Sequence, residues 1–194
     1  MRPRSASASW IHALHRWLWR HGLGLALVLA CGVAPAQAPK ASAAEVKAAY
    51  LLKIPSFVEW PAAGPTSVDA PFVILVAGAD DVMRALEELG RGARVMGRPV
   101  RIARWSAHEV PAAQLVYLGS GGPSLDQVLD GTHAASVLLV SDRPSGLAEG
   151  AALHFVEDKG RIRFEASPEN AAKQGVKLGA RLLSVAARVE GSTP

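Results

Sequence analysis

The chain of 194 residues is 49% hydrophobic and 20% charged, and it carries a formal net charge of +4. Four of its 21 lysines and arginines lie in the first 36 residues, which hold no acid, so the rest of the chain has as many basic as acidic residues, 17 of each. A neutral body gives no support for binding to nucleic acid or to an anionic membrane surface, and we expect neither.

Residues 1–36 have the pattern of an export signal. A basic stretch precedes an apolar run from Leu23 to Val33, which is shorter than the about 20 residues that a transmembrane helix needs. Small residues before the cut predict cleavage after Ala36 and therefore a periplasmic protein. The alternative is that "LVLAC" at 27–31 acts as a lipobox, so that acyl chains on Cys31 would bring the protein into direct contact with the membrane.

Cleavage would leave about 158 residues, a length at which one domain buries roughly 70% of the surface of its unfolded chain. Cys31 is the one cysteine of the chain, so the exported protein could form no disulfide and must be held by its core. We expect a flexible lead-in at 37–42, a single domain at 43–190 and a disordered tail at 191–194.

A helix is predicted to begin at Ser42, because Ser42 and Glu45 have the spacing of a capping box. The apolar residues that recur at helical spacing are Val46, Ala49, Tyr50 and Ile54. We expect this face to pack on a sheet. Pro55 lacks the amide hydrogen that would continue the helix, which should therefore end near residue 53 or 54.

The stretch "SFVEWP" at 56–61 turns the chain toward the first long strand. Trp60 precedes a proline, whose ring forces the preceding residue into an extended conformation. We therefore expect Trp60 to act first as a structural anchor, and Phe57 to lie in the core.

Strands and helices then alternate. "PFVILVAG" at 71–78 is a continuous apolar run, typical of a strand that is covered on both faces, and a helix from Asp80 to Gly90 should follow with Leu89 among its inward residues. Further strands are predicted at 99–105, 114–118 and 136–140, with helical or turn segments at 107–112 and 124–129. Such alternation indicates a largely parallel sheet.

The last third of the chain has a different period. Apolar and polar residues alternate on both sides of a turn at 157–160, which predicts an antiparallel hairpin with one wet face. Pro168 begins a terminal helical region with an apolar stripe at Leu178, Leu182, Val185 and Val189. The predicted fold class is three-layer α/β, with a mixed, mostly parallel sheet flanked by helices, a C-terminal antiparallel hairpin and a terminal helix.

One motif resembles a cofactor site. "GSGGPS" at 119–124 follows a strand and precedes a helix, with Asp142 after the next strand, as in a dinucleotide fingerprint. Ser124 stands at the third glycine position, and Pro123 removes an amide from the phosphate cradle. We interpret the loop as an ordinary turn and expect no cofactor.

The remaining chemistry is sparse. The histidines beyond residue 36 are His108, His133 and His154. None has metal-ligand spacing to another, and His154 should alternate out of the hairpin core. The acidic pairs fall at a helix start, on a helix face and in a turn, where capping or solvation explains them. We expect no metal ion, no catalytic residue and no enzymatic activity.

Six stretches in order along the chain resemble one family. They are "KAAYLLKIPSFVEWP" at 47–61, "GRPV" at 97–100, "VSD" at 140–142, "GLAEGA" at 146–151, "GRIRFE" at 160–165 and "KLGARLLSVA" at 177–186. In them the chain resembles the YfiR-like periplasmic proteins. The best-understood members are exported α/β proteins that bind the periplasmic sensor domain of an inner-membrane diguanylate cyclase and hold it inactive, which lowers cyclic-di-GMP.

The resemblance implies a non-enzymatic regulator that docks its partner through an exposed apolar patch. We expect this patch at Leu147 beside Arg143, or at the aromatic corner of Phe57 and Trp60. The chain departs from the family at Leu147, where phenylalanine is usual, and at Ser167, where asparagine is usual. It also lacks the paired cysteines of redox-sensitive members, so control through disulfides cannot operate here.

The alternative is a binding module that senses a small periplasmic ligand or serves a sensor kinase or an outer-membrane, TonB-dependent receptor, since other members of the family lie beside such proteins. Its pocket would be expected at the carboxyl ends of the parallel strands. A homodimer is compatible with either function.

Overall fold

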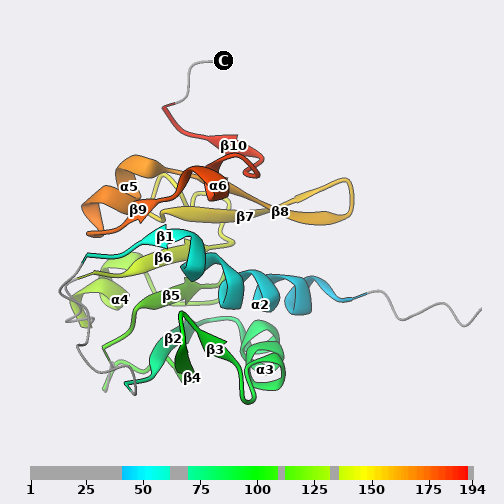
Figure 1. The fold of residues 1–194 in the computed structure, drawn as a ribbon, viewed down its shortest axis with the longest axis vertical. Helices are drawn as coiled ribbons and strands as arrows, with labels where there is room; N and C mark the ends of the chain where they lie inside the picture. The colour runs from blue at the N-terminus through cyan, green and yellow to red at the C-terminus, as the bar shows by residue number, and fades with distance from the viewer. Residues whose placement is uncertain (1–40, 62–69, 109–111, 132–135, 192–194) are drawn as a thin grey trace, which may run out of the picture. The chain divides into compact units, whose positions relative to one another are not determined.

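A mixed sheet runs through the middle of the part of the chain that the structure describes (Figure 1). The computed structural model describes residues 41–61, 70–108, 112–131 and 136–191, which belong to one compact unit, Ala41–Pro194. The predicted leader with its cleavage site and Cys31, most of the predicted lead-in and tail, and His133 lie outside these residues.

Eight strands of the described residues form this sheet. In spatial order they are β10 (Arg188–Val189), β8 (Arg161–Ala166), β7 (Leu153–Asp158), β6 (Leu138–Ser141), β5 (Leu115–Leu118), β2 (Phe72–Ala77), β4 (Arg98–Arg104) and β3 (Arg94–Val95). The pairs from β4 to β7 and the pair of β8 with β10 are parallel, whereas β7–β8 and β3–β4 are antiparallel. β2, β5 and β6 are buried along their whole length, as expected for strands covered on both faces.

Helices cover both faces of the sheet, which confirms the predicted α/β class. α2 (Ala43–Lys53) and α3 (Asp80–Leu89) pack on the face that carries Ile74 and Val76, whereas α4 (Leu125–Gly131) packs on the opposite face with Val73 and Leu75. The other elements are the 3₁₀ turn η1 (Ile54–Phe57), the antiparallel strand pair β1 (Val58–Glu59) and β9 (Lys177–Leu178), and the short helices α5 (Pro168–Lys173) and α6 (Ala180–Leu183). In the described ranges, no helix has the length and apolar character needed to cross a bilayer.

The start and the end of α2 follow the sequence prediction. The amide of Ser42 donates to a carboxylate oxygen of Glu45 at 2.6 Å, and the amide of Glu45 donates to Ser42 Oγ at 3.2 Å, so the capping box is complete. The α-helix ends at Lys53, and Pro55 lies in η1. The prediction that proline stops this helix is therefore confirmed.

The terminal region differs from the continuous apolar stripe that the sequence indicated. Leu178 lies in β9 opposite Val58, and only Leu182 lies in α6, while Val185 follows that helix and is exposed. The chain must leave helical geometry here because the amide of Gly179 donates to the carbonyl of Phe57 at 2.9 Å. The spacing of these apolar residues therefore came from successive short elements rather than from one helix.

Two glycines hold the loop after β5 against the end of β2. Gly78 has a φ of +71°, and a Cβ built on it would lie 1.9 Å from the backbone nitrogen of Gly122. Any side chain at position 78 would therefore collide with backbone, which cannot rotate away. Gly122 of the "GSGG" motif thus allows a close approach of two backbones. The approach lies at the carboxyl end of β2, which pairs with β4 on one side and with β5 on the other.

We expect Gly78→Ala to lower the free energy of unfolding by more than about 4 kcal/mol, because it adds a backbone collision to left-handed strain. Gly160→Ala is the matched control, since Gly160 has the same φ of +71° but nothing within 4 Å of its built Cβ. That variant should lose only about 1–2 kcal/mol. Urea unfolding of both variants measures the difference, and equal losses would show that the contact of Gly78 with Gly122 has no energetic role.

An ion-pair cluster ties the last strand to the hairpin. Glu165 of β8 faces His154 of β7 and Arg188 of β10 across the sheet. The Arg188 guanidinium donates to both Glu165 oxygens at 2.9 and 2.7 Å, and His154 Nδ1 lies 3.4 Å from Glu165 Oε2. His154 alternates out of the apolar core that contains Leu153 and Phe155, as predicted. It is nevertheless only 8% exposed, so the expectation of a wet face was wrong at this residue. Its partner Glu165, itself half-buried beside Arg188, covers it.

This cluster predicts a loss of stability in acid. The hydrogen bonds from Arg188, reinforced by His154, hold the pKa of Glu165 below its ordinary value of 4.5. A carboxyl whose pKa is lower in the folded state stabilises the fold above its ordinary pKa, and this contribution is lost as the pH falls below about 4.5 through the folded-state value.

Glu165→Gln should therefore lower the free energy of unfolding by about 1 kcal/mol at pH 7 and by progressively less in acid. Urea unfolding between pH 7 and pH 3 measures the gap between variant and wild type. The control is Glu157→Gln, which removes an exposed carboxylate of the same hairpin that has no ion pair among the described residues. A gap for Glu165→Gln that is independent of pH would contradict the assignment.

Candidate functional site

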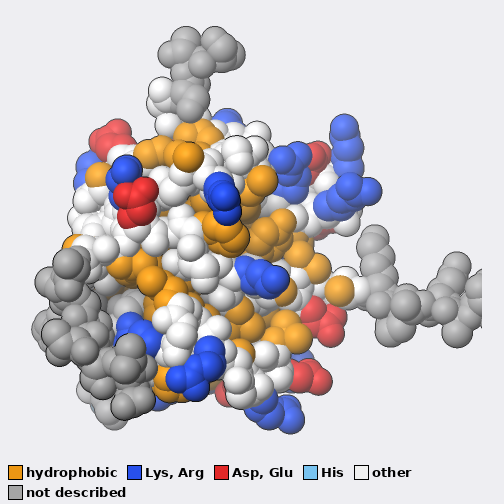
Figure 2. Space-filling model, in the orientation of Figure 1, with side chains coloured by type: hydrophobic (Ala, Val, Ile, Leu, Met, Phe, Trp, Pro, Cys, Tyr) orange, Lys and Arg blue, Asp and Glu red, His pale blue; other side chains and the backbone are white. Residues whose placement is uncertain are grey.

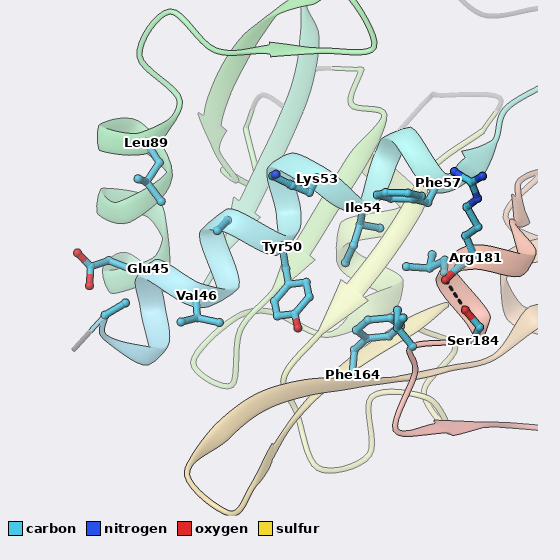
Figure 3. A pocket seen from close by; sticks show the side chains of 14 residues that line it. Glu45, Val46, Tyr50, Lys53, Ile54, Phe57, Leu89, Phe164, Arg181 and Ser184 are labelled. Carbon is cyan, nitrogen blue, oxygen red and sulfur yellow. Dashed lines mark hydrogen bonds between the residues drawn. The ribbon is translucent and has the colours of Figure 1, made fainter. Parts of the chain in front are cut away.

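An open apolar groove of about 890 Å³ runs along the outer side of α2 (Figure 3). α2 and η1 form its longest wall, and α3, β8 and the region of α6 supply the rest. The lining residues are Ala41, Glu45, Val46, Ala49, Tyr50, Lys53, Ile54, Phe57, Leu89, Phe164, Arg181, Leu182, Ser184 and Val185. We call this surface the α2 groove.

The groove exists because α2 is apolar on more than one side. Only Glu45, Lys47 and Lys53 of its eleven residues are charged. Ala48 and Leu51 face the sheet and are fully buried. The opposite side is therefore also largely apolar but has no covering element among the described residues.

The side of α2 that the sequence assigned to the core is thus only partly buried. Ile54 is buried as expected, but Val46 and Tyr50 are half-buried and Ala49 is exposed. The prediction that Ala49 faces the sheet was wrong. Apolar residues occur on more than one side of α2, so their helical spacing cannot indicate which side packs on the sheet.

Large exposed apolar side chains converge on the groove. Phe57 is 42% exposed, Leu89 is 46% exposed and Val185 is 60% exposed, and all three line it. Phe57 and Leu89 were expected in the core, and both predictions were wrong. Figure 2 shows apolar side chains gathered over α2 and the C-terminal elements beside it, with lysine and arginine side chains among them. Single exposed apolar residues need no explanation, but a contiguous set marks an interaction site.

An aromatic cluster makes one part of the groove rigid. The ring of Tyr50 lies 5.7 Å from that of Phe155 and 5.9 Å from that of Phe164, measured between centroids, and the second pair meets edge to face. Figure 3 shows Tyr50 and Phe164 turned toward one another beneath α2. Such packing fixes the rings before any partner arrives, so little side-chain entropy is lost on binding.

The charges of the groove are unevenly distributed. Glu45 lies at one end, where its carboxylate accepts the Ser42 amide, and this hydrogen bond holds the pKa of Glu45 below its usual range. Lys53 and Arg181 lie toward the other end, both exposed and, within the part of the chain that the structure describes, without an ion pair. The end of the groove near Phe57 is therefore basic.

A partly buried ion pair fixes α2 from its inner side. Lys47 Nζ lies 2.6 Å from Asp142 Oδ2, and the hydroxyl of Tyr117 donates to the same oxygen at 2.7 Å. Burial, together with the negative charge of Asp142, raises the pKa of Tyr117 far above its usual range, so the phenol stays a donor. These contacts join α2 to the carboxyl ends of β5 and β6, and they set which side of α2 faces outward.

Lys47→Met should lower the free energy of unfolding by about 3 kcal/mol, because it leaves the Asp142 carboxylate sheltered from water without its cation. Lys173→Met is the matched control, since Lys173 makes an exposed ion pair with Glu169 at 2.8 Å, and we expect a change below about 0.5 kcal/mol. The double variant with Asp142→Asn should recover part of the loss. Chemical denaturation measures all three, and similar small losses for both lysines would contradict a stabilising role for Lys47.

The comparisons with known proteins identify the family. Residues 44–187 match the family model described as YfiR/HmsC-like. The chain belongs to the YfiR/HmsC-like family. The match includes α2 from its second residue, the Lys47–Asp142 ion pair and every lining residue of the α2 groove except Ala41. No curated protein matches the chain.

Trp60 of this YfiR/HmsC-like chain lies where an anchor would be expected. Its indole nitrogen donates to the carbonyl of Pro55 at 3.0 Å, and its ring meets that of Phe72 edge to face at 5.8 Å. The structural role predicted for Trp60 is confirmed. Phe57 and Trp60 are separated by three positions, but Phe57 lines the α2 groove whereas Trp60 packs onto β2.

The predicted patch at Arg143 and Leu147 is folded into the protein. Leu147 is 6% exposed, so its expected exposure was wrong. The turn that carries it is closed by Asn170, whose amide nitrogen donates to the carbonyls of Leu147 and Ala151 at 2.8 and 2.9 Å. A direct role of Leu147 in partner binding stays an untested prediction.

Arg143 lies in the same turn and is bound to its own chain. Its guanidinium donates to the carbonyls of Gly119, Gly122 and Pro123, and it forms an ion pair with Glu149. Arg143 thereby fastens the "GSGG" loop. In the described ranges, no cluster of three or more histidine, cysteine or acidic side chains is arranged to hold a metal ion.

Sequence reasoning did not find the residues that make the groove a site. Leu89, Val185, Lys53 and Arg181 are far apart in sequence, and the first two had been assigned to core faces. The available signal was the composition of α2, in which eight of eleven residues are apolar. A helix with so few polar positions has a second apolar side that needs a partner.

Proposed function

We propose that this chain is an exported regulator that binds the periplasmic domain of an inner-membrane diguanylate cyclase and holds it inactive, so that cyclic-di-GMP falls. The observation that carries the proposal is the match of residues 44–187 to the YfiR/HmsC-like family. The best-understood proteins that the chain resembles act in this way.

The composition of the α2 groove supports docking of a protein. Aromatic residues and arginine are enriched where protein interfaces gain most of their binding energy. The groove presents Tyr50, Phe57 and Arg181 together with Leu89 and Val185. We therefore assign partner binding to the α2 groove rather than to Leu147. Of the residues that the sequence suggested for partner binding, Phe57 lines this groove.

The N-terminal pattern supports the proposed location. The basic stretch and the short apolar run at Leu23–Val33 are typical of an export signal. In the periplasm, the protein would meet the extracytoplasmic domain of a membrane-bound cyclase.

Deletion of the gene should raise cyclic-di-GMP about twofold or more, and expression of the full chain should reverse the rise. A variant that lacks residues 1–36 should be made in similar amount but should fail to restore the level, because it stays on the wrong side of the membrane from the cyclase's sensor domain. Mass spectrometry of nucleotide extracts measures the change. An unchanged level on deletion would contradict the proposal.

A second function is favoured by one observation. The groove volume of about 890 Å³ falls within the range of small-molecule sites, so a ligand sensor that serves a kinase or an outer-membrane receptor is the alternative. Its pocket would be the α2 groove rather than the carboxyl ends of the parallel strands, where Gly78 and Gly122 are in contact. A sensor of this kind predicts unchanged cyclic-di-GMP on deletion.

A further inference from the structure

The dimensions of the α2 groove fit a helix. Its longest wall is α2, whose eleven residues extend for about 16 Å at 1.5 Å per residue, or three turns. Ala49 is exposed near the middle of this wall, and a side chain this small lets another backbone approach to the 8–10 Å that separates packed helices. Figure 3 shows Leu89 near the Glu45 end and Arg181 near the Phe57 end of the groove.

Two described walls of the groove offer a guest little backbone to pair with. Between its end turns, α2 uses its amides and carbonyls within the helix, and the carbonyl of Phe164 in β8 already accepts the amide of Ala187 at 2.7 Å. An extended peptide that docks by strand addition needs free partners on an edge strand, whereas a helix satisfies its own backbone hydrogen bonds. This difference favours a helical occupant.

The charges specify the occupant further. Glu45 is engaged by the Ser42 amide, while Lys53 and Arg181 have no ion pair among the described residues. Acidic side chains on the guest would find Arg181 beside Phe57 and Lys53 farther toward the middle of the groove (Figure 3). Interfacial charges that are complementary in this way raise association rates and fix the register of the guest.

We propose that the α2 groove binds an amphipathic helix of the partner, with an apolar side on Tyr50, Phe57 and Leu89 and acidic side chains at Lys53 and at Arg181. This inference rests on the proposed function and names the chemistry of the partner segment. A second copy of this chain or a lipid acyl chain would be a different occupant. An acyl chain in so open a groove would leave much of its own surface in water.

Photo-crosslinking in intact cells identifies the occupant. Ala49→p-benzoylphenylalanine places the reactive group on the exposed wall. Arg101→p-benzoylphenylalanine is the control, because Arg101 is exposed and alternates with Val100 and Ile102 onto the other face of the sheet. We expect the Ala49 variant to give an adduct with a membrane protein, mapped by mass spectrometry to a segment with apolar residues at helical spacing and an aspartate or glutamate. An adduct with a second copy, with lipid or with nothing would overturn the inference.

A charge exchange tests the acidic contact. Lys53→Glu combined with Arg181→Glu should lower the affinity for a synthetic peptide of the mapped segment by about tenfold or more, and replacing the acids of the peptide by lysine should restore it. Arg101→Glu should leave the affinity unchanged. Circular dichroism should show that all variants stay folded, since the exchanged side chains are exposed and unpaired among the described residues. Only a small drop in melting temperature is expected from Lys53→Glu, because Lys53 lies in the last turn of α2. Unchanged affinity in the double variant would overturn the inference.

The two proposals fail separately. If gene deletion raises cyclic-di-GMP but the variant with Lys53→Glu and Arg181→Glu still restores the low level, the groove inference fails and the regulatory function stands. If deletion leaves cyclic-di-GMP unchanged while the Ala49 adduct maps to an acidic amphipathic helix of another membrane protein, the cyclase assignment fails and the groove inference stands.

Discussion

The ion pair between Lys47 and Asp142 determines how α2 lies on the sheet. α2 has few polar residues that could fix its rotation about the helix axis. Of these, Lys47 points inward and forms an ion pair with Asp142, whose carboxylate also accepts a hydrogen bond from Tyr117. With Lys47 facing the sheet, Ala48 and Leu51 are brought to the core by their positions on the helix. The same rotation turns an apolar side to the solvent, and the α2 groove follows from it.

Much of the fold could be predicted because local signals and tertiary structure agree. The capping box at Ser42, the stop at Pro55 and the buried strand Phe72–Ala77 are each dictated by backbone chemistry or by a run of apolar residues. The C-terminal region was harder to predict. There, Leu178, Leu182 and Val185 have the spacing of one helix face. Leu178 nevertheless lies in a strand, because it pairs with Val58, a residue 120 positions earlier in the chain.

The candidate site could not be predicted from the sequence for a related reason. Phe57, Leu89 and Val185 look like core residues by type, and only the positions of α3 and α6 relative to α2 leave them exposed. Leu147 shows the converse error, because the family resemblance implied an exposed apolar patch there, while the turn that carries Leu147 is closed by hydrogen bonds from Asn170 and the side chain is buried. Type and spacing therefore indicated which residues are apolar, but not which apolar surfaces have a covering element.

The contact of Gly78 with Gly122 limits how this scaffold can be engineered. The carboxyl ends of parallel strands are where new ligand sites are usually built into α/β proteins, yet here the backbones themselves touch. Side-chain substitution cannot open a cavity between atoms that belong to the main chain. A biosensor made from this protein would gain its specificity along α2, where wall residues can be exchanged without moving the sheet.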